Sequence, residues 1–149
     1  MELILFDKLK IDYIKEIIQI RNECVEQLID NRKIRLVDMV AFYLLNIKTG
    51  REKVYFIKNE NNIIGYMNEK YISPAICEIG IKIKQEYRGQ KLGHEALSLL
   101  IKQIFNGPTT EIIAEIKKDN IISQNLFKFL GFNITQEKET TNIWSLKKE

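Results

Sequence analysis

Residues 76–96 read ICEIGIKIKQEYRGQKLGHEA, and this stretch decides the fold because a strand passes directly into a helix within it. Isoleucines at 79, 81 and 83 alternate with Gly80, Lys82 and Lys84, which predicts a strand with one buried and one polar face. Ile76 is out of phase with this alternation. A β-bulge beside Gly80 would explain the slip, and so would an irregular strand end.

The turn after this strand has the features of an anion site. A helix is predicted over Leu92 to Phe105, and its first turn exposes unpaired backbone N–H groups and the positive end of the helix dipole. Gly89 and Gly93 leave room for a phosphate, while Arg88 and Lys91 add positive charge. Neither GxxxxGK nor GxGxxG is present. A solvated loop is the alternative, but the position between an alternating strand and an amphipathic helix favours phosphate binding.

The rest of the chain alternates between helical and strand periodicity. We expect one domain over residues 1–149 with an α/β fold. Its sheet should be mixed, mostly antiparallel and roughly six- to seven-stranded, flanked by about four helices, with a parallel pair beside the Leu92 helix. Strands are expected at Leu3–Phe6, Lys53–Lys58, Ile63–Tyr71, Ile112–Ile116 and around Ile134 and Ile143–Leu146; helices are expected between Asp12 and Asn46, broken near Asp30–Lys33, and over Ile121–Leu130 before a left-handed Gly131.

Composition narrows the class of protein. The 149 residues are 45% hydrophobic and 29% charged, with a net charge of +3 spread along the chain. We therefore expect a cytoplasmic globular protein without a membrane segment and without the clustered charge of a nucleic-acid binder. Cys24 and Cys77 lack CxxC spacing, which predicts reduced, packed thiols and no metal site.

Two blocks of sequence resemble the GNAT superfamily of acetyl-CoA-dependent N-acyltransferases. Its signature is a strand followed by Arg/Gln-x-x-Gly-x-Gly/Ala at a helix start; Arg88 and Gly93 match the ends, and Lys91 replaces the inner glycine. The second block, N-x-x-A-x-x-L-Y-x-K-L-G-F, is similar to residues 120–132, where the asparagine, the leucine and the final Leu-Gly-Phe match.

The resemblance implies acetyl-CoA as cosubstrate and assigns its site. The backbone around Ile81 and Ile83 would pair with the pantetheine arm as an added strand does. The basic group Lys82, Lys84, Arg88 and Lys91 would face the phosphates, although a solvated strand edge suits Lys82 and Lys84 equally well. The pyrophosphate would lie on Arg88, Gly89, Gln90, Lys91, Leu92, Gly93 and His94, and the thiol end near Asn120, Ser123 and Phe127.

Acyl transfer to an amine requires removal of the amine's proton, and a carboxylate suits this task. Glu115 is the first candidate base and Glu78 the second, with a solvated strand position as the alternative for each. Phe127 stands where the family commonly has a tyrosine that protonates the leaving thiolate; Tyr87, Tyr66 or water would replace it. His94 is expected to face solvent, and Cys77 to be packed, since it has no histidine nearby in sequence.

The acceptor is expected to be a primary amine of a small molecule, such as an amino sugar or polyamine, or of a peptide. Segments at Arg21-Asn22, Val25 and Asn31–Ile34 are similar to the acceptor side of acetyltransferases for amino sugars or ribosomal-protein N-termini. By position, Tyr55, Tyr66, Asn68 and Glu69 are further candidates. A non-catalytic acyl-CoA-binding module is the alternative function, and a homodimer is compatible with the sequence.

Overall fold

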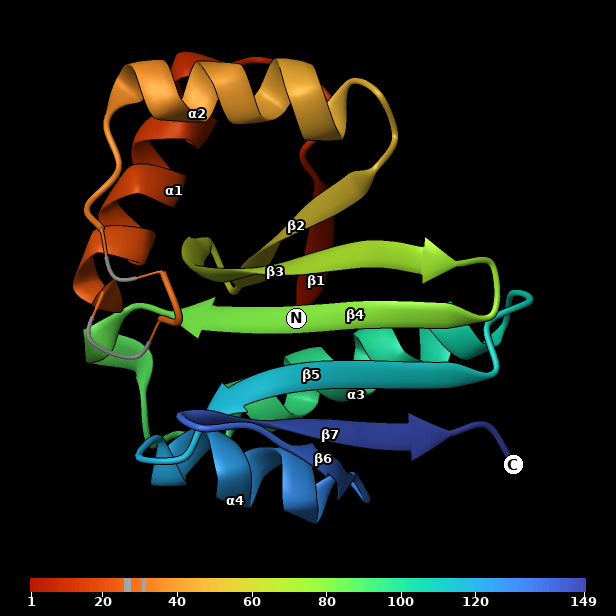
Figure 1. The fold of residues 1–149 in the computed structure, drawn as a ribbon. Coiled ribbons are helices and arrows are strands. Elements are labelled where there is room, and N and C mark those ends of the chain that lie inside the picture. Colours follow the sequence, from red (N-terminus) through yellow and green to blue (C-terminus); the bar gives the residue numbers. More distant parts are fainter. Residues whose placement is uncertain (26–27, 31) are drawn as a thin grey trace.

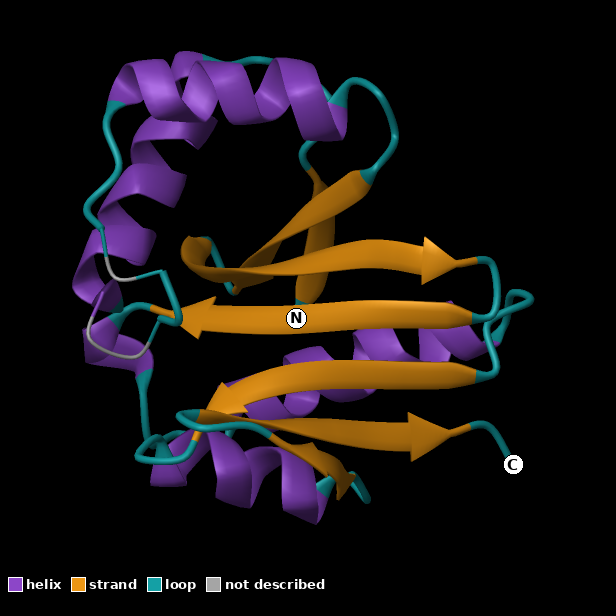
Figure 2. Ribbon diagram, in the orientation of Figure 1, coloured by secondary structure: helices purple, strands orange, loops and turns teal. Residues whose placement is uncertain are grey.

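The computed structural model describes residues 1–25, 28–30 and 32–149. A seven-stranded sheet runs in the order β1-β2-β3-β4-β5-β7-β6 (Figures 1 and 2). Neighbouring strands are antiparallel except β4 and β5, which are parallel, so the predicted fold class is confirmed. The strands are β1 Glu2–Leu5, β2 Glu52–Asn59, β3 Asn62–Ser73, β4 Ile76–Ile83, β5 Glu111–Lys117, β6 Asn133–Glu137 and β7 Thr141–Lys147.

Helices cover different parts of the two faces of the sheet. α1 (Ile11–Glu23) and α2 (Leu36–Phe42, continued by a π-helical turn over Tyr43–Ile47) share a core with one face of β2 and β3. α3 (Leu92–Phe105) and α4 (Ile121–Phe129) share the larger core with the opposite face. Figure 1 shows α3 behind β4 and β5, while α1 and α2 gather beside β2 and β3. The non-core face of β4 and β5 therefore remains open beside α1.

The alternation in β4 has the predicted effect. Cys77 and Ile79 lie in the larger core, and Ile81 and Ile83 pack against its margin. No bulge occurs at Gly80, which pairs in register with Asn68. The irregularity lies instead at the end of β3, between Tyr71 and Ser73 and opposite Ile76, so the irregular strand end is the correct explanation.

Short-range signals place both ends of α4. Gly131 has a φ of +94°, as predicted for the residue that ends α4. At the start of this helix, the Asn120 side chain accepts a hydrogen bond from the Ser123 amide at 3.2 Å. The connection between α1 and α2 is longer than the expected break at 30–33, because α1 ends at Glu23 and α2 begins at Leu36.

In the part of the chain that the structure describes, no helix is both long enough and apolar enough to cross a membrane. Both cysteines are buried free thiols, as the sequence predicts.

Candidate active site

The parallel strands β4 and β5 pair only at their beginning. Ile76, Cys77 and Glu78 lie opposite Glu111, Ile112 and Ile113, and no further pairs form between these strands in the described chain. The strands then part, so the β4 edge from Ile79 to Ile83 bonds to β3 on one side only. A cavity of about 270 Å³ lies at this opening and is lined by residues of both strands and of α4. An extended, amide-bearing ligand could add to the free edge as a further strand does.

The turn between β4 and α3 presents free amides next to this opening. A short 3-10 helix over Gln85–Tyr87 leads into the turn, and α3 begins at Leu92. Gly89 and Lys91 both adopt left-handed conformations, with φ of +76° and +62°. Within the described chain, the amides of residues 89–94 donate to no protein acceptor. Together with the helix dipole, these amides form a site that fits a pyrophosphate.

The basic side chains near the turn have separate partners. The Arg88 guanidinium donates to the Ile83 carbonyl at 2.9 Å and to the Cys24 sulfur at 3.1 Å, so it fixes the turn to the end of β4. Lys84 is buried and forms an ion pair with Glu16 at 2.8 Å. Lys91 is exposed at the turn, whereas Lys82 lies away from the turn, in the wall of a second cavity described below. The unpaired hydrogen-bond donors of the turn are thus mainly backbone amides.

Both candidate bases line the first cavity, but their environments differ. Glu115 accepts a hydrogen bond from the Thr141 hydroxyl at 2.7 Å and forms an ion pair with Lys138 at 3.4 Å. The Glu78 carboxylate has no hydrogen bond or ion pair with any described residue. Glu78 is therefore the carboxylate that is free to accept a proton.

A second cavity of about 350 Å³ lies between α1, α2 and the sheet. Its wall combines carboxylates with apolar side chains such as Met39, Phe42 and Val54. Burial raises the pKa of Glu52, against the opposing effect of Lys70 and Lys82. The residues that line both cavities are Arg21, Asp30, Asn68 and Lys82, so the two cavities meet along this group.

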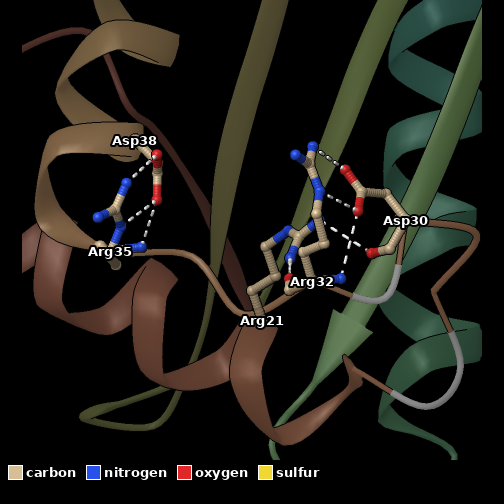
Figure 3. A network of polar contacts seen from close by, with 5 residues as sticks. All are labelled: Arg21, Asp30, Arg32, Arg35 and Asp38. Atoms are coloured by element: carbon tan, nitrogen blue, oxygen red, sulfur yellow. Dashed lines mark hydrogen bonds and ion pairs between the residues drawn. The ribbon is translucent and has the colours of Figure 1, made fainter.

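The connection between α1 and α2 forms one wall of both cavities, and α1 holds it in place. Arg21 donates to the carbonyls of Arg32 at 2.7 Å and Asp30 at 3.1 Å (Figure 3). Asn22 exchanges hydrogen bonds with the backbone of Ile34, at 3.1 Å and 3.4 Å. Figure 3 also shows two local ion pairs, Asp30 with Arg32 and Arg35 with Asp38. Asn31, part of the predicted acceptor segment, lies outside the described residues.

Lys82 stands where the two cavities meet. Its Nζ lies 3.4 Å from Asn68 Oδ1 and 5.3 Å from the centroid of the Tyr66 ring. Burial, and secondly the Arg21 guanidinium, lower the pKa of the Lys82 ammonium to about 8. Burial also raises the pKa of Tyr66, so its hydroxyl stays protonated at neutral pH.

Comparison with known proteins supports this geometry. The family model described as "Acetyltransferase (GNAT) domain" matches residues 10–133, well over half of the chain. The chain belongs to the GNAT acetyltransferase family. It is therefore an acyltransferase with acetyl-CoA as its cosubstrate, as the sequence predicts. No curated protein sequence matches it.

Solved GNAT structures share the fold at low sequence identity. The Campylobacter jejuni N-acetyltransferase PseH in complex with acetyl coenzyme A is 21% identical over 99% of each chain, with a TM-score of 0.82. Salmonella typhimurium yncA with its cofactor acetyl-CoA is 18% identical over 99% of this chain and 94% of that one, with a TM-score of 0.77. An N-acetyltransferase from Staphylococcus aureus Mu50 is 13% identical over 99% of each chain, also with a TM-score of 0.77.

In this GNAT chain, three residues of the second sequence block lie together at one cavity. Asn120, Ser123 and Phe127 all line the first cavity. Phe127 is buried and packs edge-on against Phe132, with ring centroids 5.0 Å apart. His94 is half-buried, with its ring against that of Phe129 at 4.9 Å, and so differs from the solvent-facing residue expected.

The four residues predicted by position on β2 and β3 lie on two different faces of the sheet. Tyr66 and Asn68 line the second cavity, but Tyr55 and Glu69 point to the opposite face, where Tyr55 belongs to the larger core and Glu69 is buried. Their assignment to the acceptor site is wrong. Cys77 lies in that core, and burial raises the pKa of its thiol to about 12, which makes it inert.

Sequence reasoning missed Glu52, which lines the second cavity. A signal was available, because Glu52 has the same strand parity as Val54, which lines the same cavity. Arg21 was predicted as part of a segment, but its hydrogen bonds could not be predicted, since they depend on the path of the connection after α1. Among the described residues, no group of three or more His, Cys, Asp or Glu side chains could hold a metal ion.

Proposed function

We propose that this GNAT acetyltransferase transfers the acetyl group of acetyl-CoA to the primary amine of a small polar molecule held in the second cavity. The observation that carries the proposal is the meeting of the two cavities where β4 and β5 part. One opening suits the cofactor arm, and the other is a partly open cavity of about 350 Å³, the size of a small-molecule site. A cavity of this size suits a polyamine or an amino sugar better than it suits a segment of another protein.

The cavity walls support an amine-bearing acceptor. Glu52 supplies a carboxylate that would attract a cation, whereas Asp30 and Asp38 are already paired with Arg32 and Arg35. The apolar side chains restrict the path of the acceptor. An alkylammonium is almost fully charged at neutral pH, so the acceptor must lose a proton before it attacks. We assign this step to Glu78, directly or through a water molecule, because Glu115 is already engaged by Thr141 and Lys138.

Bound acetyl-CoA would supply an activated acyl group as a thioester. The free edge of β4 would orient its pantetheine arm, and the amides of residues 89–94 would hold its pyrophosphate. Arg88 would act by fixing the turn, and Lys91 by adding charge at its exposed side. Asn120, Ser123 and Phe127 would enclose the thiol end.

A second candidate, a non-catalytic acyl-CoA-binding module, is favoured by Phe127, which cannot protonate a thiolate. Among the described residues that line the first cavity there is no tyrosine. A thiol with a pKa near 8.5 is nevertheless a fair leaving group, and general acid assistance contributes only about 10²- to 10⁴-fold. Turnover with any member of a panel of polyamines and amino sugars would exclude this module, whereas CoA binding without turnover would support it.

Arg88→Glu tests the placement of the pyrophosphate. We expect the Kd for acetyl-CoA, measured by calorimetry, to rise at least about tenfold, because the turn loses its anchor and gains a negative charge. Lys102→Glu is the matched control, since it makes the same change of charge at an exposed position of α3. Thermal unfolding of both variants checks that they are folded. Unchanged affinity in Arg88→Glu would refute the placement.

A further inference from the structure

The Lys82 side chain lies over Gly80, where β4 and β5 part. Its Nζ lies 3.7 Å from the position that a Cβ of Gly80 would occupy, and that Cβ would stand 2.7 Å from Asn68 Oδ1. A side chain at position 80 would therefore collide with Asn68 and crowd the amine. The glycine leaves the space in which the Lys82 amine rests between the two cavities.

This position is the one that the acceptor's amine must reach. An acceptor in the second cavity has to approach the first through the residues common to both. Of these, Arg21, Asp30 and Asn68 carry no primary amine. Lys82 is the one primary amine among these four residues, so an amine of the protein itself occupies the position that the acceptor's amine must reach.

The surroundings of Lys82 favour a neutral amine. The pKa falls from 10.5 to about 8, so near neutral pH the neutral fraction is about 300-fold larger than for an exposed lysine. Burial is the largest cause and the Arg21 guanidinium adds to it, whereas Cys24, Glu52 and Glu78 oppose it. The titratable and charged groups around Lys82 are Arg21 on α1, Cys24 and Asp30 after it, Glu52 on β2, Tyr66 on β3 and Glu78 on β4.

We infer that Lys82 is a site of self-acetylation, at which the enzyme transfers an acetyl group to its own amine when no acceptor is bound. The inference rests on the proposed function, because it needs acetyl-CoA in the opening between β4 and β5. The neutral Nζ attacks the thioester carbonyl carbon; the C–N bond forms, the C–S bond breaks, and CoA leaves as a thiolate. The proton lost by the nitrogen passes to Glu78 or water and then to the thiolate.

Self-acetylation would also regulate the enzyme. An acetylated Lys82 is longer and uncharged, so it would fill the passage between the cavities and block the approach of an acceptor. We expect turnover of an acceptor amine to fall in proportion to the modified fraction. A bound acceptor would occupy the same passage and protect Lys82.

The test is incubation of the purified full chain with acetyl-CoA alone, followed by intact-mass and peptide mass spectrometry. We expect one acetyl group per chain at Lys82, incorporated at least about tenfold faster than at the exposed Lys102 or the ion-paired Lys84. The rate should rise with pH up to about 8 and then level off, whereas the rate at Lys102 should keep rising.

Two controls keep the inference falsifiable. Lys82→Arg should remove the added acetyl group while the protein still binds acetyl-CoA by calorimetry, and unfolding the wild type in urea should abolish the preference for Lys82. If acetyl-CoA binds and amines are acetylated but Lys82 stays unmodified, the inference is wrong and the proposed function stands. If acetyl-CoA is not retained, both are wrong.

Discussion

Lys91 occupies a backbone conformation that suits glycine. Its φ of +62° and ψ of +10° place it in the left-handed region at the start of α3, where the family signature has its inner glycine. A residue with a side chain in this region costs about 1 to 2 kcal/mol relative to glycine. Part of this cost is offset, because glycine loses more conformational entropy on folding. The lysine that departs from the family pattern has thus kept the backbone geometry of the turn.

Replacing this lysine should stabilise the protein. For Lys91→Gly we expect the free energy of unfolding to rise by roughly 0.5 to 1 kcal/mol, read from urea denaturation at unchanged m value. Lys91→Ala is the control, because alanine keeps the strained Cβ, and it should give no gain. Equal stability of all three proteins would show that the left-handed residue carries no strain.

The two candidate bases can be separated at single residues. Glu78→Gln should lower kcat for an acceptor amine by about 10²- to 10⁴-fold, because the proton acceptor is lost. Glu115→Gln should have a small effect, since a glutamine can still accept from Thr141. A reversed result, with activity lost only in Glu115→Gln, would reassign the base.

Our proposal reverses the order that the sequence suggested, Glu115 first and Glu78 second, for a physical reason. Both residues were predicted on strands, and both line the first cavity. What distinguishes them is Thr141 and Lys138, which reach Glu115 from the C-terminal hairpin. Contacts between residues so far apart in the chain leave no trace in local periodicity.

At the scale of elements, the end of α1 determines the shape of the acceptor side. Asn22 fixes Ile34 through both its backbone groups, without lining either cavity itself. Removing this pair should loosen the connection between α1 and α2 while the cofactor edge of β4 keeps its geometry. We expect such a change to weaken binding of the acceptor without changing binding of acetyl-CoA.

For Asn22→Ala we expect the KM for the acceptor to rise roughly two- to tenfold, which corresponds to the loss of about one hydrogen bond. Steady-state kinetics with each substrate varied in turn should show an unchanged KM for acetyl-CoA. Gln19→Ala is the control, because its hydrogen bond to Glu23 stays within α1. An equal rise in both KM values would mean that the connection does not act on the acceptor side alone.

The elements themselves were largely predictable because their signals are local. Alternation in β4, helical spacing in α3 and the glycine after α4 each identify one element, and the chain order implied the parallel β4–β5 pair. The bulge considered at Gly80 does not occur and the acceptor role predicted for Tyr55 and Glu69 is wrong, because neighbouring strands determine register and strand parity. The free β4 edge likewise follows from how early β5 diverges.

At the scale of the whole molecule, the sheet consists of two parts joined at a narrow seam. Strands β1 to β4 form one antiparallel part and β5, β7 and β6 the other, and they meet through the three residue pairs between β4 and β5. A ligand inserted beyond this seam would bridge both parts. It would replace missing strand pairing and so stabilise the native state as a whole.

Acetyl-CoA at about 100 times its Kd should add about 2.7 kcal/mol to the free energy of unfolding, which raises the Tm by roughly 5 to 10 °C for a chain of this size. Hydrogen exchange should show where the ligand lies: amides of residues 79–83 and 89–94 should become protected, while those of β6, at the far edge, should not change. A Tm increase with protection elsewhere would indicate a different binding site, and no increase at saturation would contradict a bridge between the two parts of the sheet.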